Sequence, residues 1–130
     1  MKLKIITQER VVFDQEVDAV YSKGIDGEFG ILKGHIPMMS ALDIGVTRAI
    51  VNDEVKTFTT MGGILQFKNE ECLILTTLAE PGEEIDEARA REALERARTQ
   101  LRNANARLDA KRAEAAIARA EARLKAKLSK

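Results

Sequence analysis

The chain has 130 residues, 45% of them hydrophobic and 32% charged, which predicts a soluble globular protein with one moderate core or two small ones. Its 21 basic and 21 acidic residues balance, so no overall positive field favours nucleic acid as a partner. No stretch approaches the roughly 20 apolar residues that span a bilayer, and the N-terminus lacks the apolar region of a signal peptide. We therefore expect a cytoplasmic chain that reaches a membrane only through partners.

The first 82 residues have the sequence pattern of β structure. Segments that alternate or are rich in β-branched residues occur at KLKIIT, which places Leu3 and Ile5 on one face, and at VDAVYSK, GVTRAIV and VKTFTTM. ECLILTT reads as one short buried run. Turn signals recur about every 8 to 12 residues, as in sandwiches and barrels, at residues 24–27, 52–53, 62–63 and 69–71. We therefore predict an all-β sandwich.

A glycine-rich stretch follows the second of these segments, and its glycines Gly24, Gly27, Gly30 and Gly34 are spaced as in successive turns. No Lys-Ser or Lys-Thr completes a phosphate loop after them. His35, the only histidine, is expected at a turn or strand edge, because no second histidine or carboxylate cluster offers it a metal or a catalytic triad. No metal site is therefore predicted.

The single cysteine, Cys72, lies within the apolar run CLIL. In that setting a thiol acts most often as a small hydrophobic side chain. We expect Cys72 to be buried and to have no redox or metal-binding role.

The composition changes at Pro81–Gly82. All eight glycines, both prolines and all five Phe and Tyr residues lie at or before Gly82, whereas residues 83–130 contain 14 alanines and no aromatic residue. The first 82 residues carry 8 basic and 12 acidic side chains, and the last 48 carry 13 and 9. We predict a boundary here between a β-rich domain at 1–82 and a helical domain at 83–130.

The second domain has the pattern of two helices. Asp86 is a suitable N-cap, and acidic residues around it favour the helix dipole. Leu94, Leu101 and Leu108 repeat every seven residues, and Ile117, Leu124 and Leu128 form a new stripe. We predict helices at about 86–103 and 109–128 joined into an antiparallel hairpin, although NANARLD between them also permits one continuous helix. The predicted fold class is α+β, an N-terminal all-β sandwich followed by this hairpin.

Arginines form a stripe on each predicted helix, largely opposite the Leu and Ile stripe: Arg89 and Arg96 on the first, and Arg112, Arg119 and Arg123 on the second. The simplest interpretation is a solvated basic face. Such a face also suits contact with an acidic partner surface, or a triphosphate held by several guanidinium groups through bidentate hydrogen bonds.

Three segments resemble the ε subunit of bacterial F-type ATP synthase: GEFGILKGHIPMMSAL at 27–42, GGIL at 62–65 and IDEARA at 85–90. They occur in the same order as in that family. This resemblance implies a noncatalytic subunit of the central stalk, or rotor. Its sandwich would dock on the γ subunit and the ring of c subunits, and its hairpin would regulate the α/β catalytic head. The location implied is the cytoplasmic face of the bacterial cell membrane, as a peripheral protein.

The resemblance also implies site residues. Family members that bind ATP share an Ile/Leu-Asp-x-x-Arg-Ala motif, so ATP is a possible regulatory ligand here and no cofactor is required. The implied ATP-binding residues are Glu80, Ile85, Asp86, Arg89, Ala90, Arg96, Arg112, Arg119 and Arg123. The implied residues of the docking surface for γ and the c-ring are Gly30, His35, Pro37, Met38 and Met39, with core filling an equal alternative for the two methionines.

The apolar content of the hairpin is low enough for a switch. It has seven large apolar residues, each contributing about 1.5–3 kcal/mol when buried, against an ordering cost of about 1.5 kcal/mol per residue. The hairpin alone is therefore expected to be marginally stable. Straightened into one helix it would reach about 65–70 Å, and by resemblance this extended form enters the head and blocks ATP hydrolysis.

The sequence also bears on two other classes of function. A small hydrolase needs a nucleophile and a base in a pocket, and one histidine, one cysteine and no recognisable serine motif argue against it. An adaptor whose basic helices bind RNA or a partner's coiled coil is compatible with the net charge of +4 on residues 83–130. Salt-resistant association with γ would distinguish a rotor subunit from such an adaptor.

Overall fold

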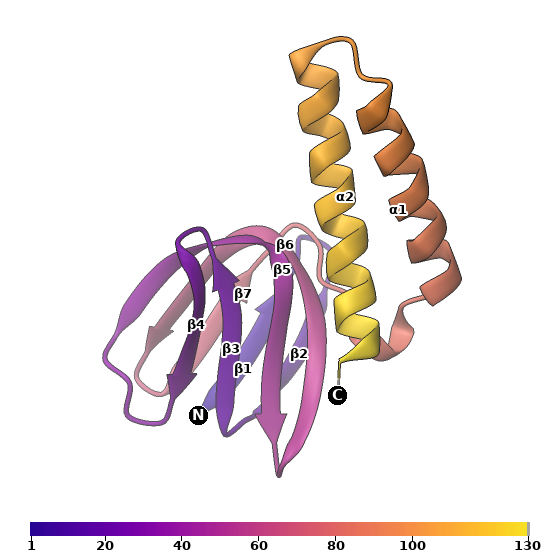
Figure 1. Cartoon of the computed structure of the whole chain (residues 1–130). Coiled ribbons are helices and arrows are strands. Elements are labelled where there is room, and N and C mark those ends of the chain that lie inside the picture. The colour runs from indigo at the N-terminus through magenta and orange to yellow at the C-terminus, as the bar shows by residue number, and fades with distance from the viewer. Residues whose placement is uncertain (130) are drawn as a thin grey trace.

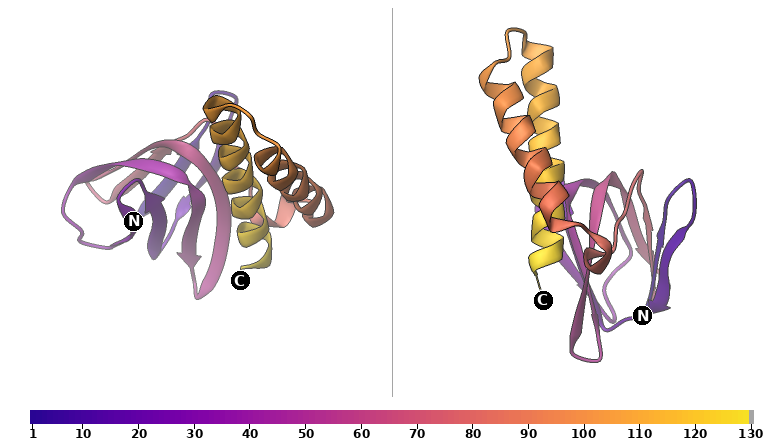
Figure 2. Two further views of the ribbon diagram at one scale, coloured as in Figure 1. Left: turned by 45° about the horizontal axis from the view of Figure 1, so that its top comes forward. Right: turned by 90° about the vertical axis from the view of Figure 1, so that its right-hand side faces the viewer.

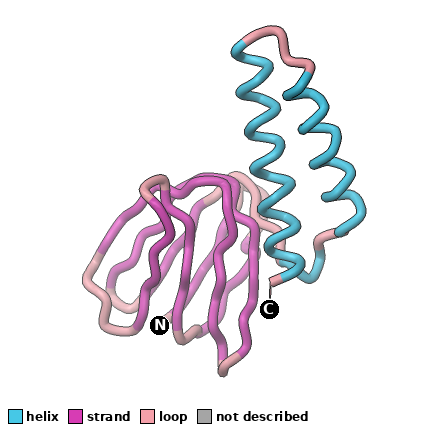
Figure 3. The backbone as a smooth tube through the Cα atoms, viewed as in Figure 1, coloured by secondary structure: helices cyan, strands magenta, loops and turns pink. Residues whose placement is uncertain are grey.

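The computed structural model describes residues 1–129 as a β-sandwich with a two-helix hairpin standing beside it (Figures 1 and 3). The predicted fold class is confirmed. Lys130, the last residue of the predicted helical domain, lies outside the described residues. No helix within residues 1–129 combines the length and apolar character needed to cross a membrane.

One seven-stranded sheet in the order β2-β1-β7-β6-β5-β3-β4 forms both layers of the sandwich. β1 pairs in parallel with β7, and the other neighbours are antiparallel. The two longest strands, β5 and β6, curve around the core (Figure 2). The strands are β1 Lys2–Ile6, β2 Val11–Glu16, β3 Ala19–Gly24, β4 Gly27–Leu32, β5 Met38–Val51, β6 Glu54–Lys68 and β7 Glu71–Leu75.

Gly62–Gly63 lies inside β6, so the turn predicted there is wrong. The register passes from Ile44↔Met61 to Leu42↔Gly63, and the two glycines have φ of 78° and 112°. A Cβ at Gly63 would meet the carbonyl oxygen of Leu75 on the neighbouring strand. The glycines therefore let β6 bend and approach β7 closely without reversing the chain.

Gly30 is also not in a turn, because it lies within β4 opposite Tyr21. A Cβ at Gly30 would lie 2.7 Å from the Tyr21 ring, so the glycine makes room for the aromatic side chain. The buried run predicted at β7 alternates instead: Cys72 and Ile74 are buried, but Leu75 is 48% exposed. This strand has one face on the core and one face outside.

The sandwich core lies between the two layers and contains the Leu3–Ile5 pair expected from the sequence. Both side chains have no exposed surface, as do Ile31, Leu65 and Ile74. The core is thus built by inward-facing residues from several strands that are distant in sequence.

The helical part consists of a short 3-10 turn η1 at Gly82–Glu84, α1 at Glu87–Arg102 and α2 at Arg107–Leu128. Asp86 caps α1 as predicted, since its carboxylate accepts from the backbone N–H of Arg89 at 3.1 Å. The chain reverses at residues 103–106, and α1 and α2 run side by side (Figures 1 and 2).

Small residues dominate the buried face of the hairpin. Of the seven large apolar residues counted in the sequence, only Ile85 and Leu94 are buried, and Leu108 and Leu128 are 59% and 57% exposed. Leu108 therefore does not continue the stripe predicted from Leu94, because the turn places it on the second helix. The other buried side chains of the two helices are all alanines: Ala90, Ala97, Ala113, Ala120, Ala122 and Ala126.

Candidate functional site

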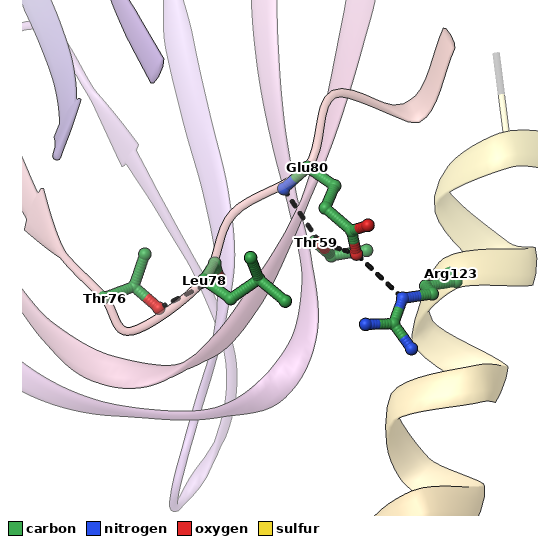
Figure 4. Close-up of polar contacts among 5 residues, drawn as sticks. All are labelled: Thr59, Thr76, Leu78, Glu80 and Arg123. Carbon is green, nitrogen blue, oxygen red and sulfur yellow. Dashed lines mark hydrogen bonds and ion pairs between the residues drawn. The ribbon is translucent and has the colours of Figure 1, made fainter. Parts of the chain in front are cut away.

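The segment between β7 and the hairpin runs back along β6 as an extra edge (Figure 4). The backbone N–H of Thr59 donates to the Glu80 carbonyl at 2.9 Å, and that of Met61 donates to the Leu78 carbonyl at 3.2 Å. The Glu80 N–H donates to Thr59 Oγ1 at 3.0 Å, and the Thr76 hydroxyl to the Leu78 carbonyl at 3.3 Å. This linker is therefore held to the sandwich almost as a strand.

Glu80 links the sandwich to the hairpin. Its Oε1 accepts from Arg123 Nε on α2 at 2.8 Å and from the Thr59 hydroxyl at 3.4 Å (Figure 4). The side chains of Arg123 and Glu80 are only 27% and 32% exposed. A short, partly buried contact of this kind is a charge-assisted hydrogen bond, the stronger class.

Further contacts of the hairpin with the sandwich fall on the last two turns of α2. Thr57 Oγ1 donates to the Ala126 carbonyl at 2.6 Å, and Ala126 packs with Val46 and Ile85. Lys125 reaches Glu28 at 3.4 Å. Helix α2 packs on β5, β6 and η1, whereas α1 packs mainly on α2. The hairpin is thus attached at its base, and its tip extends beyond the sheet (Figure 1).

The structure brings together only part of the ATP-binding set that the resemblance implied. Glu80 and Arg123 are in contact, and Asp86 meets the backbone of Arg89. Arg119 is half-buried one turn before Arg123. Of the remaining members, Ile85 and Ala90 are buried, whereas Arg89, Arg96 and Arg112 are exposed.

The arginine stripe on α2, expected to lie largely opposite the apolar stripe, has one member on the side that faces the sandwich. Arg123 turns toward the sandwich and pairs with Glu80. Thr57 and Thr59, which were not among the predicted site residues, bond the base of the hairpin and the linker, respectively. Their alternation with buried Phe58 was the available signal, because it places both hydroxyls on the outer face of a strand.

Two hollows flank the base of α2. The larger, of about 630 Å³, lies between the ends of β2, β6 and α2, and the smaller, of about 250 Å³, lies beside β3, β4 and β5. None of the arginines predicted to bind ATP lines either hollow. A nucleotide in contact with those arginines would therefore lie elsewhere on the hairpin.

The predicted docking residues form a mixed set. Met38 packs against the core, and the His35 ring meets Phe67 edge-on at 6.0 Å between ring centroids. Pro37 is exposed and Met39 is 67% exposed. Gly30 is half-buried within β4. Only part of this set is thus available to a partner.

An apolar row crosses the outer face of the layer that contains β1, β7 and the end of β6. The register aligns Ile6, Leu75, Ile64 and Ala41 on four neighbouring strands. Ile64 and Leu75 are 46% and 48% exposed. Contiguous apolar residues on an exposed sheet face are typical of protein contact surfaces. This row could not be seen in the sequence as long as β7 was expected to be a buried run, because that expectation hides the exposed face with Leu75.

Cys72 is buried and unpaired, and burial raises the pKa of its thiol to about 12. The thiol therefore stays protonated and unreactive near neutral pH. Within residues 1–129 no cluster of His, Cys, Asp and Glu has the arrangement of a metal site.

Comparison with known proteins places this architecture in a family. Residues 1–82 match the family described as "ATP synthase, Delta/Epsilon chain, beta-sandwich domain", and residues 83–127 match its "long alpha-helix domain". The ATP synthase epsilon chain of Carboxydothermus hydrogenoformans is 45% identical over 101 residues, which cover 78% of this chain and 75% of the relative. The chain belongs to the ATP synthase epsilon-chain family.

Other epsilon chains and solved assemblies are also similar. The chloroplastic epsilon chain of Gossypium hirsutum is 38% identical over 104 residues, covering 80% of this chain and 78% of that one. A chain of the Euglena gracilis mitochondrial ATP synthase, solved as OSCP/F1/c-ring, superposes with a TM-score of 0.82 and 26% identity over 92% of this chain and 76% of that one. A chain from the Tetrahymena thermophila central stalk and c-ring shares the fold, with a TM-score of 0.64 at 14% identity over 97% and 95% of the two chains.

Proposed function

We propose that this epsilon chain is a noncatalytic subunit of the rotor, in which residues 1–82 anchor the protein and residues 83–130 regulate ATP hydrolysis. The anchor docks on the γ subunit and the c-ring at the cytoplasmic face of the bacterial membrane. The family and the titles of the similar assemblies, which name the central stalk and the c-ring, support this placement.

The outer apolar row is the best candidate for the contact with γ. Ile64 and Leu75 lie in the row with about half of their surface exposed. Pro37 and Met39 extend the apolar surface from the neighbouring end of β5. An apolar face of this kind favours a lasting partner in an assembly over a brief encounter.

Charge substitutions test this docking surface. Ile64→Glu and Leu75→Glu should abolish co-purification with γ in salt, because each places a carboxylate in an apolar contact. Gln66→Glu is the matched control, since Gln66 lies two residues from Ile64 on the same strand face. Retention of γ by both apolar-site variants would place the contact elsewhere.

The observation that carries the regulatory half of the proposal is the attachment of the hairpin at its base. Helix α1 packs mainly on α2, and α2 meets the sandwich through its last turns. Most large apolar residues of the hairpin are not fully buried. A body held by so few contacts needs only a modest difference in ligand affinity to redistribute between folded and extended forms.

Deletion of residues 83–130 tests this regulation. ATP hydrolysis by the enzyme reassembled with the shortened chain should rise, because no arm remains to enter the α/β head. The control is the full-length chain carrying Arg98→Ala, since Arg98 is paired with Glu95 on the exposed side of α1. Equal hydrolysis with the shortened and full-length chains would remove the regulatory role and leave docking intact.

ATP is proposed to bind without hydrolysis and to favour the folded hairpin. The supporting geometry is the half-buried Arg119 and Arg123 one turn apart on α2, next to the linker carboxylate of Glu80. Guanidinium groups grip phosphates through bidentate hydrogen bonds. With ATP bound, Arg123 would either keep its bond to Glu80 within the site or release Glu80 and bind a phosphate group.

Calorimetry of the isolated chain tests ATP binding. Arg89→Ala with Arg119→Ala should lower the affinity for ATP by at least about a hundredfold, as expected for the loss of two charged contacts of about 1.5–3 kcal/mol each. Arg98→Ala should bind like the wild type. Unchanged binding by the double variant would show that these arginines are not the site.

A further inference from the structure

The base of α2 meets the sandwich in a contact that has no room for another atom. Thr57 Oγ1 donates to the Ala126 carbonyl at 2.6 Å, and Gly82 lies against both residues. A Cβ at residue 82 would lie 2.5 Å from the Ala126 carbonyl oxygen and closer still to Thr57 Oγ1. Gly82 is not among the glycines with positive φ. The contact with α2, and not the backbone conformation, therefore requires glycine here.

The Ala126 carbonyl depends on Thr57 because of its place in the helix. Helix α2 ends at Leu128, so Ala126 lies in its last turn, and within residues 1–129 the donor to its carbonyl is the Thr57 hydroxyl. Ala126 is 1% exposed and Thr57 9% exposed. A buried carbonyl without a donor is strongly disfavoured. The Thr57 hydroxyl thus satisfies this helix end only when α2 is fully seated.

Gly82 also lies at the point where the chain leaves the sheet. The linker is bonded to β6 as far as Pro81, which forms a bridge with Phe58. The next hydrogen bonds, from Glu84 N–H to the Pro81 carbonyl and from Ile85 N–H to the Gly82 carbonyl, are local to η1. If the arm straightens while the linker stays in place, the chain must pivot at residues 82–86.

We propose that Thr57, Gly82 and Ala126 form a latch that holds the hairpin on the sandwich and sets the balance between its folded and released forms. This inference rests on the proposed regulatory function, because the released form is the one that would act on the enzyme. The nearby side chains of Arg123 and Lys125 are long and follow small shifts of α2. The contact at Gly82 involves backbone atoms and a short side chain, so it forms completely or not at all.

Hydrogen exchange of the full-length chain, measured by mass spectrometry without nucleotide or partner, tests the latch. Thr57→Val keeps the shape of the side chain but removes the donor, and should speed exchange of the α2 amides about tenfold. Gly82→Ala should speed it at least as much, because the folded form has no room for the methyl group. Thr57→Ser keeps the hydroxyl and should exchange like the wild type.

Thr60→Val is the matched control, since Thr60 has no exposed surface and bonds Thr47 inside the sandwich at 3.3 Å. Its α2 amides should exchange like those of the wild type. The latch is overturned if Thr57→Val and Gly82→Ala leave α2 exchange unchanged, or if Thr60→Val accelerates it equally. It is also overturned if the core strands β1 and β7 exchange faster in step with α2.

This experiment is independent of the proposed regulation of the enzyme. Failure of the chain to bind ATP or to inhibit hydrolysis would end the proposed function and leave the exchange result standing. Normal inhibition together with unchanged exchange in the variants would remove the latch alone.

Discussion

The Glu80–Arg123 pair gives the sharpest quantitative test of how the hairpin is held. A neutral Glu80→Gln and a neutral Arg123→Gln each remove one charge from a contact of 2.8 Å. A hydrogen bond to a charged group contributes about 1.5–3 kcal/mol. Because about 27% and 32% of the two side chains remain exposed, we discount this to a coupling of about 1–2 kcal/mol.

The assay is a double-mutant cycle on the opening free energy of α2, taken from native-state amide exchange. The Lys125–Glu28 pair is the internal control, since it joins the same helix to the same sandwich at 3.4 Å with side chains 60% and 64% exposed. Its coupling should stay below about 0.5 kcal/mol. A Glu80–Arg123 coupling no larger than that of the control would refute the role assigned to this pair.

Three further predictions concern the sandwich core, the N-cap of α1 and the buried thiol. Leu65→Ala, in the sandwich core, should lower the free energy of unfolding in urea by about 2–5 kcal/mol. The control Leu108→Ala, at an exposed position, should change it by less than about 0.5 kcal/mol. Equal effects would contradict the burial of Leu65 and the exposure of Leu108. Asp86→Ala should cost about 1 kcal/mol, read from the thermal loss of helical circular dichroism, and an unchanged midpoint would deny the cap. Cys72 should resist a thiol reagent in the native state, and rapid labelling of the native protein would contradict its burial. The free energy of unfolding should fall as pH rises from 9.0 toward about 12, because in this range the thiol ionises in the unfolded chain but not in the folded one.

Much of the fold could be predicted because its signals are local. Alternation placed Leu3 and Ile5 on the core face, and the polar group of Asp86 marked the start of α1. The bend of β6 could not be predicted in this way. Gly62–Gly63 supplies the same positive φ to a tight turn or to a curved strand, and the pairing of the chain beyond it with β7 decides between them.

The candidate site was less accessible to sequence reasoning because its residues are distant along the chain. Glu80 and Arg123 are 43 positions apart, and the resemblance named both without indicating that they pair. The seven-residue repeat of leucines was misleading, since the reversal at 103–106 moves Leu108 onto the second helix and into solvent. Thr57 is visible in the sequence only as an outward residue of a strand, and the alanine that covers it is 69 positions away.

The most direct test of the account is the distance between the tip of the hairpin and the sandwich. Spin labels at Asn105→Cys, in the turn between the helices, and at exposed Asp26→Cys report this distance, and buried Cys72 should not take up label. The account predicts two distance populations in the chain without nucleotide, a shift to the shorter one with ATP, and a shift to the longer one in Gly82→Ala. A single population that ATP and Gly82→Ala both leave unchanged would contradict a releasable hairpin.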